Sequence, residues 1–343
     1  MRIPFRLSLA LWGIALLVFL GHAVSRLLFF RSLFFEHSGI RLTQPEVATA
    51  AVDSAGPSGA RQQYIPKIIH NVFHNWREPG NDTLPADMAA MRQTCIDTNP
   101  DFEFRLWTEK ESREFIEREY PWFLNTYDGY RYPVQRVDTV RYFLMQHYGG
   151  IYMDLDNGCK TDLTPLLYYP LWVTDGGRGA LSNNILASRP GHPFWHRLTL
   201  SLIPYDWKWP LPYVTIMYAT GQWFLTAIWE EYHALLPKPG SSNAAADGGH
   251  GYEHEHRLYR IMMDMAPDAD PWVFFSHQEG GGGTWNNWDN ELFAAIGDHL
   301  LLFFTLLFVG IWLVGWTGLR CLRRYRAGGY TRLNKRPGSS SVV

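Results

Sequence analysis

Two aspartates near the middle of the chain have the type and spacing that metal binding requires. Asp154 and Asp156 stand two residues apart at the end of the predicted strand Ile151–Leu155. On an extended strand, side chains two residues apart point to the same side. Adjacent carboxylate oxygens suit a hard divalent cation such as Mn²⁺ or Mg²⁺, and such a cation in turn binds phosphate oxygens. The pair therefore predicts an enzyme that handles a nucleotide diphosphate.

A predicted helix leads directly into this strand. It covers 133–148, with Pro133 in its first turn and two glycines at its end. Asp138 and Arg141 stand three residues apart on it, so their side chains are neighbours on one face. A simple ion pair is one interpretation of this arrangement. The position of the pair, one helix ahead of the two aspartates, favours a second interpretation in which both side chains stand beside a bound ligand.

The elements that must position these residues alternate along the chain. Strand patterns cover 65–73, 102–107 and 151–155, and helix patterns cover 84–98, 109–119 and 133–148. This alternation predicts an α/β sheet of the Rossmann-like kind. Ligands of such sheets bind at the carboxyl ends of the strands. Asp154 and Asp156 are predicted to lie at such an end.

Two apolar runs frame the chain. Residues 7–24 and 300–319 contain no Asp, Glu, Lys or Arg, and each has roughly the 20 residues that a bilayer core requires. The first run is either an uncleaved anchor or a signal peptide, because positions 21–23 form a small-x-small cleavage pattern. We favour the anchor, since apolar residues continue at 27–30. The second run predicts a transmembrane helix.

Charge predicts the orientation and the partners. Seven basic residues and no acidic residue follow position 319, which places that end in the cytosol by the positive-inside rule. The predicted organisation is an anchor at 1–31, a stalk at 32–63, a lumenal domain at 64–298, a span at 299–319 and a basic tail at 320–343. Between residues 32 and 299 there are 33 acidic and 20 basic residues, which argues against a nucleic acid partner.

Two further features bear on the lumenal domain. Cys95 and Cys159 are both expected in the lumen, where a disulfide persists, so a bridge between them is a hypothesis. The segment 205–232 is rich in Trp and Tyr. These residues are more often core than site, but they also favour membrane interfaces. The segment is therefore a candidate to face the membrane and help admit a lipid acceptor.

The central motif resembles a known family. The chain reads Arg136-x-Asp138-x-x-Arg141-Tyr142, then Gly149-Gly150-x-Tyr152-x-Asp154-x-Asp156, which is similar to the sugar-binding and DxD region of glycosyltransferase family 32. The resemblance extends over about 64–289. It implies a GT-A-type fold, a divalent metal ion (Mn²⁺ or Mg²⁺), GDP-mannose as donor and retention of the anomeric configuration.

The resemblance also implies roles for single residues. Asp156 is then the principal metal ligand, Asp154 assists it, and His277 is a later ligand of the metal or the diphosphate. Asp138 and Arg141 hold hydroxyls of the mannose.

Four more residues are carried over to the donor site. His70 and Phe73 belong to the first strand, with Phe73 facing the guanine. Asn183 and Asn184 line the sugar or acceptor side.

With its C-terminal span, the chain is most similar within the family to fungal mannosyltransferases that act on inositol phosphorylceramide. The expected reaction is transfer of mannose from GDP-mannose to this lipid in the Golgi lumen, with a multi-spanning regulatory subunit as partner. The alternatives are a Golgi mannosyltransferase acting on protein-linked glycans and a catalytically inactive membrane subunit. A metal that stabilises the leaving diphosphate suits this chemistry, and retention suggests attack from the front face.

Overall fold

The computed structural model describes most of the chain. It describes residues 37–53, 62–177, 179–236, 258–278 and 288–333, with short stretches at 13–14, 17–22, 24–25 and 34. The chain divides into two units, Met1–Trp285 and Asn286–Val343, and each is described by itself. Most of the predicted anchor at 1–31 lies outside the described residues.

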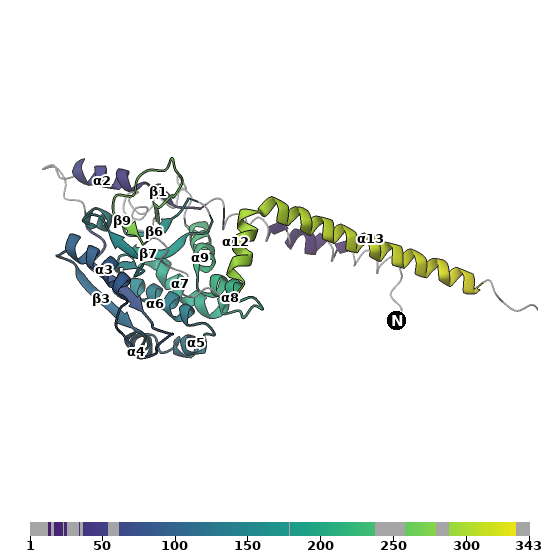
Figure 1. Ribbon diagram of the computed structural model, residues 1–343, viewed down its shortest axis with the longest axis horizontal. Helices are drawn as coiled ribbons and strands as arrows, with labels where there is room; N and C mark the ends of the chain where they lie inside the picture. The colour runs from purple at the N-terminus through teal and green to yellow at the C-terminus, as the bar shows by residue number, and fades with distance from the viewer. Residues whose placement is uncertain are drawn as a thin grey trace, which may run out of the picture. The chain divides into compact units, whose positions relative to one another are not determined.

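A seven-stranded sheet forms the centre of the first unit, in the order β1-β8-β6-β7-β4-β2-β3 (Figure 1). Its strands are β1 (Ile40–Leu42), β2 (Ile68–Phe73), β3 (Glu103–Thr108), β4 (Gly150–Met153), β6 (Leu171–Asp175), β7 (Ser182–Ser188) and β8 (Tyr259–Met262). Neighbouring strands are parallel except where β7 pairs with β4 and β6. The other six strands therefore end at one common edge of the sheet.

Helices cover both faces of this sheet (Figure 1). They are α2 (Gln44–Asp53), α3 (Ala86–Thr98), α4 (Glu109–Glu119), α5 (Leu124–Gly129), α6 (Pro133–His147), the 3₁₀ helix η1 (Thr164–Tyr168), α7 (Pro193–Tyr205), α8 (Pro212–Ala219) and α9 (Gln222–Leu235). Successive residues of β4 alternate between two cores. Tyr152 packs in the core that α4, α6, α7 and α9 share, whereas Ile151 and Met153 pack in the core on the α3 side. The predicted α/β sheet is confirmed.

Helix α6 carries the central motif and is almost wholly buried between the sheet and α7. Pro133 begins it, because the fixed φ of proline suits the first turn and its missing N–H is not needed there. Gly149 follows its end with φ +64°, and a Cβ at this position would lie 2.6 Å from the carbonyl oxygen of Ser188. Only glycine allows the chain to turn this tightly from the helix into β4.

The stalk prediction is wrong for residues 40–53. β1 pairs in parallel with β8 at the edge of the sheet, and α2 follows it. The buried side chain of Gln44 donates to the carbonyl of Met262 and accepts from the backbone N–H groups of Val273 and Phe274. The small residues that suggested a linker include several alanines, and alanine is also the best helix former. The segment is thus part of the folded unit.

A two-stranded sheet follows the two aspartates. β5 (Asn157–Cys159) pairs antiparallel with β9 (Phe275–His277). The predicted bridge between Cys95 and Cys159 is confirmed, with 4.7 Å between their Cα atoms. The bridge fixes β5 to α3, directly beyond the metal-binding motif.

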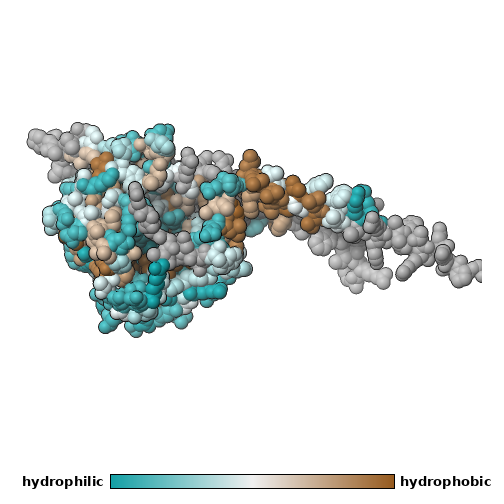
Figure 2. All heavy atoms as spheres, in the orientation of Figure 1, coloured by the Kyte–Doolittle hydropathy of each residue, from teal (hydrophilic) through white to brown (hydrophobic). Residues whose placement is uncertain are grey.

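The second unit contains α12 (Asn290–Asp298) and α13 (Leu300–Leu333). Within the part of the chain that the structure describes, Leu301–Arg320 is the one candidate for a membrane span, by length and composition alone. Its mean hydropathy is 2.0, and Figure 2 shows hydrophobic side chains gathered along this helix. The window agrees with the predicted span at 299–319. The second predicted span, at the N-terminus, lies mostly outside the described residues.

The disulfide gives the first prediction. Replacing both Cys95 and Cys159 by Ala should lower the free energy of unfolding by about 4 kcal/mol, because the bridge closes a loop of 64 residues. The measurement is the midpoint of thermal inactivation, compared with a Cys321→Ala control that leaves the bridge in place. A double variant as heat-resistant as the control would contradict the stabilising role.

Candidate active site

The predicted site residues come together at the edge of the sheet where β4 ends. α6 supplies Asp138 and Arg141, and the residues after β4 supply Asp154 and Asp156. Because β7 runs in the opposite direction, its first residues reach the same edge and bring in Asn183. The helix start and the glycine turn described above set the register of α6 against β4, so the α6 pair faces the strand end.

Arg141 is the centre of the cluster and is only 4% exposed. Its Nη1 donates to the carbonyl of Asn183 at 2.6 Å and lies 3.3 Å from Oδ1 of Asp154. Its Nη2 lies 3.2 Å from Oδ1 of Asp138. The guanidinium also stacks over the ring of Tyr152, with 4.7 Å to the centroid. Burial alone would lower the pKa of Arg141. The neighbouring Asp154, Tyr152 and Asp138 raise this pKa by more than burial lowers it, so the guanidinium stays charged.

Burial of Asp138 carries a desolvation cost, because its carboxylate is only 4% exposed. Asn183 Nδ2 and Thr220 Oγ1 donate to its two oxygens, each at 3.0 Å. Burial raises the pKa of Asp138 to about 6, against the lowering effect of Arg141. A buried carboxyl whose pKa is shifted towards neutrality is a frequent mark of a functional site.

Asp154 and Asp156 differ in how firmly they are held. Arg141 and the hydroxyl of Tyr152 both contact Asp154, and its backbone N–H donates to the carbonyl of Asn184. Asp156 accepts from the Asn157 side chain at 2.7 Å. Burial, and next the neighbouring Asp154, raise the pKa of Asp156. Asp156 is therefore the less constrained carboxylate and the better placed to ligate a cation.

The two asparagines have different positions. Asn183 is buried and connects Asp138 to the Tyr142 hydroxyl through its side-chain amide. The Oδ1 atom of Asn184 accepts from Thr174 and Ser182. Asn184 thus braces the strand beside Asp154, while Asn183 belongs to the cluster itself.

His70 and Phe73 lie in β2, three strand positions away from each other, and both are buried. His70 accepts from Trp107 Nε1 through Nδ1 at 3.1 Å, so its proton is on Nε2, which faces the carbonyl of Gly149 at 3.0 Å. Burial, helped by Arg105, lowers the pKa of His70 to about 3. Both ring nitrogens are occupied within the protein, so we leave His70 out of the donor site proposed below. Phe73 ends β2 at the same edge as the cluster.

His277 ends β9, where it pairs with Asn157 and is exposed. The pKa of Asp156 is raised mainly by burial, and the neighbouring His277 opposes this effect. The backbone N–H of Gln278 donates to the carbonyl of Asp156 at 2.9 Å. The strand thus brings His277 close to Asp156.

The charges of the cluster suit a divalent cation. Asp138, Asp154, Asp156 and Arg141 together carry two net negative charges when all are ionised. One divalent ion beside Asp156 would neutralise this charge and remove the repulsion that raises its pKa. No group of three or more His, Cys, Asp or Glu side chains that could hold a metal occurs within the described residues. A cation held here would therefore need further ligands from the phosphates of a bound ligand.

Two contributors to the site were not predicted from the sequence. Thr220, at the end of α8, donates to Asp138, and its carbonyl accepts from the Tyr142 hydroxyl. A Cβ on the next residue, Gly221, would lie 3.1 Å from the Cα of Met217. Thr220 and Gly221 form a tight turn between α8 and α9. This Thr-Gly pair is the sequence signal from which a role for Thr220 could have been inferred. Tyr152 was part of the motif, and its hydroxyl donates to Asp154, two residues further along the chain.

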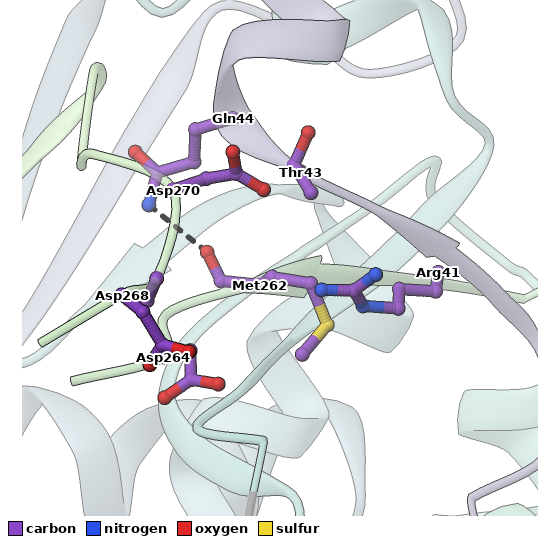
Figure 3. A pocket seen from close by; sticks show the side chains of 8 residues that line it. Arg41, Thr43, Gln44, Met262, Asp264, Asp268 and Asp270 are labelled. Atoms are coloured by element: carbon purple, nitrogen blue, oxygen red, sulfur yellow. Dashed lines mark hydrogen bonds between the residues drawn. The ribbon is translucent and has the colours of Figure 1, made fainter. Parts of the chain in front are cut away.

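A hollow opens on the same edge of the sheet, between the ends of β1 and β8 (Figure 3). We call it the second hollow, because it lies apart from the charged cluster. Its volume is about 220 Å³, and Arg41, Gln44 and Asp264 help to line it. β1 is four strand positions from β4, which corresponds to roughly 19 Å. None of the predicted site residues lines it. The hydrogen bond from Gln44 to Met262 closes one side of it (Figure 3).

Sequence comparison finds a match to known proteins in the same region of the chain. Residues 85–172 match a family model described as a glycosyltransferase sugar-binding region containing a DXD motif. The chain is 37% identical over 242 residues to mannosyl phosphorylinositol ceramide synthase SUR1 of Saccharomyces cerevisiae, covering 70% of this chain and 57% of that protein. It is 36% identical over 250 residues to inositol phosphoceramide mannosyltransferase 3 of Schizosaccharomyces pombe, covering 73% and 64%. The chain thus spans about three fifths of the length of these relatives.

Among solved structures, the chain is similar to the PaToxG glycosyltransferase, with 14% identity and a TM-score of 0.36 over 55% of this chain and 75% of that one. A score of this size is too low to define a shared fold, so the description of the fold rests on the strand order above.

The strand order and the carboxylate cluster define an α/β protein with a buried group of charged side chains at the carboxyl edge of its sheet. Residues 85–172 match a glycosyltransferase sugar-binding region that contains a DXD motif. Over about 70% of its length the chain is similar to yeast proteins named as mannosyl phosphorylinositol ceramide synthase and inositol phosphoceramide mannosyltransferase.

The raised pKa of Asp138 predicts a pH-dependent stability. Its pKa of about 6 in the folded state exceeds the ordinary value of 3.8, so the folded state is favoured while the group is protonated and loses this advantage as the pH rises through 6. Between pH 5 and 7.5 the cost is about 1 kcal/mol. An Asp138→Asn variant lacks this titration. Its thermal unfolding midpoint should therefore rise relative to that of the unaltered protein as the pH increases, and a difference that does not change with pH would contradict the assignment.

Proposed function

We propose that the chain is a retaining mannosyltransferase that moves mannose from GDP-mannose to the inositol of inositol phosphorylceramide. The observation that carries the proposal is the buried cluster of Asp138, Arg141 and Asn183 directly beside Asp154 and Asp156. The names of the two similar yeast proteins state a mannosyl group and inositol phosphoceramide, and they support the transferred sugar and the acceptor.

The residues divide the work by their positions. We assign a divalent cation, Mn²⁺ or Mg²⁺, to Asp156, with Asp154 and His277 beside it and with phosphate oxygens of the donor as further ligands. When bound, this cation would stabilise the charge on the leaving diphosphate. Asp138 and Asn183 present hydrogen-bond acceptors and donors to the sugar hydroxyls. Arg141 holds Asp138 and Asp154 at a fixed distance from each other and adds positive charge near the leaving group.

The base and the acceptor are assigned to opposite sides of this cluster. Phe73, at the end of β2, is the proposed contact of the guanine. Asn184 supports the strand that borders the acceptor side. We propose that the acceptor hydroxyl attacks the face from which the diphosphate leaves, with a phosphate oxygen taking its proton. Retention follows from attack on that face.

The surroundings are proposed to be the Golgi membrane, with the first unit in the lumen, the basic tail in the cytosol and a multi-spanning regulatory subunit as partner. The Cys95–Cys159 bridge supports an oxidising compartment for the first unit. The candidate span at Leu301–Arg320 supports attachment to a membrane.

The test is transfer from labelled GDP-mannose to inositol phosphorylceramide by the full chain in detergent, with Mn²⁺ or with a chelator. Asp156→Ala should reduce transfer by at least about 100-fold, because the leaving diphosphate loses its metal. Chelation should do the same to the unaltered protein. Asp268→Ala, which removes an exposed carboxylate at the second hollow, is the matched control and should keep full activity.

Three outcomes would overturn the proposal. Full turnover by Asp156→Ala would contradict the proposed metal site. Transfer to protein-linked glycans but not to the lipid would assign another acceptor. An unaltered protein that binds neither Mn²⁺ nor GDP would identify an inactive subunit.

A further inference from the structure

An exposed apolar surface surrounds the loop between α7 and α8. Its members are Leu200 and Ile203 on α7 and the indoles of Trp207 and Trp209 in the loop, with exposed fractions of 50%, 46%, 68% and 42%. We call these four side chains the aromatic ledge. The other aromatic residues of the same segment are half-buried or buried, and Phe224 and Trp229 on α9 are completely buried. The exposure is therefore a property of the ledge and not of the whole segment.

The ledge is held in place by its backbone. The N–H of Trp209 donates to Thr215 Oγ1 at 3.0 Å, and this hydroxyl lies 3.1 Å from the carbonyl of Trp209. Trp207 Nε1 donates to the carbonyl of Pro204 at 3.0 Å. Thr215 itself is buried in α8. Two indoles fixed in an exposed position leave a large apolar area in water, which is unfavourable unless something covers it.

The chemistry of the ledge matches a bilayer surface. Trp207 and Trp209 flank Lys208, so two amphipathic indoles stand on either side of an ammonium group. Indoles prefer the headgroup level of a bilayer, and a lysine can extend to lipid phosphates from there.

The chain itself brings a bilayer within reach. The first unit ends at Trp285, and the candidate span begins at Leu301. The 15 residues between them reach at most about 50 Å when fully extended, and α12 shortens this further. A surface tethered this closely meets the bilayer at a high effective concentration.

The ledge is also connected to the active site. α8 begins three residues after Trp209, and at its other end Thr220 donates to Asp138. An eight-residue helix is about 12 Å long. A headgroup that leaves the bilayer beside the ledge thus has a short path to the cluster that is proposed to hold the sugar.

We propose that the aromatic ledge rests in the headgroup layer of the bilayer and presents the lipid acceptor to the site. This inference rests on the proposed function for its acceptor, but the contact with the bilayer can be measured without any turnover. Leu200 and Ile203 then enter the upper acyl region, and the two indoles lie at the level of the phosphates.

The first experiment measures the contact directly. An environment-sensitive fluorophore is attached through Trp207→Cys in the full chain, with Cys321→Ser to remove the tail thiol, and the protein is reconstituted into phosphatidylcholine vesicles containing a spin-labelled lipid. The label should be quenched by the spin-labelled lipid and protected from aqueous iodide. A label attached through Trp122→Cys is the matched control. Trp122 is a tryptophan outside the ledge that is similarly exposed, at 45%, and it packs on Phe143 of α6. This label should show the opposite pattern.

The second experiment separates the bilayer from the chemistry. A Trp207→Ser/Trp209→Ser variant should lose about tenfold or more in kcat/KM for inositol phosphorylceramide in vesicles, because two indoles no longer leave water. Transfer to water-soluble glycerophosphoinositol, and hydrolysis of GDP-mannose, should stay unchanged. Trp122→Ser should keep all three activities.

The outcomes distinguish the two proposals. Iodide-accessible, unquenched label at position 207 in a protein that transfers mannose to lipid would overturn the ledge and leave the proposed function intact. Quenched label in a protein that transfers nothing would support the ledge and overturn the function. Protection that increases with protein density, without lipid quenching, would assign the ledge to a second copy of the chain and overturn the proposal.

Discussion

The site depends on one buried guanidinium. Arg141 contacts Asp138 and Asp154 and the carbonyl of Asn183, so it joins α6, the end of β4 and the start of β7 at one point. Removing charges from water is costly, and a buried ion pair often contributes little net stability. The pKa of Asp138, raised to about 6, shows that the ionised carboxyl is not the form that the fold favours most. The arrangement is better explained by a requirement for fixed charges at a ligand than by stability.

The fold supplies the rigidity that this arrangement needs. Because six of the seven strands run in one direction, the ends of β2, β4 and β6 meet at one edge, and β7 adds its first residues there. The turn at Gly149 lets α6 return directly onto β4. Thr220 closes the cluster from the side of α8 and α9. Each charged group is thus held from at least two elements, and a shift of one helix would leave a carboxylate unpaired.

Much of this could be read from the sequence, and the failures have physical causes. The helix patterns placed α4 at its observed bounds and α6 within a residue, and Pro133 and Gly149 mark the start and the end of α6. Spacing alone brought Asp154 and Asp156 to the end of a strand. Tertiary contacts were not readable in this way. β1 is three residues long and is defined only by its pairing with β8, so a segment rich in small residues resembled a stalk.

The same limit applies to side chains whose roles depend on direction. The family resemblance implies a ligand contact for His70, but its two ring nitrogens face Trp107 and the carbonyl of Gly149. Thr220 lies 82 residues from Asp138, and no local pattern predicts that pairing.

The remaining constraint is on Asp156, which follows β4 and would move freely if the next residues were a loop. On one side, the Asp154 N–H is fixed to the carbonyl of Asn184. On the other, β5 is bonded through Cys159 to Cys95, and its backbone N–H at that residue donates to Thr94 Oγ1. Asp156 thus stands between two anchored points, one two residues before it and the other three residues after it. A cation held there would keep a nearly fixed position relative to Arg141, and such preorganisation would favour the proposed transfer. The disulfide is therefore as much a part of the site's geometry as the carboxylates that it steadies.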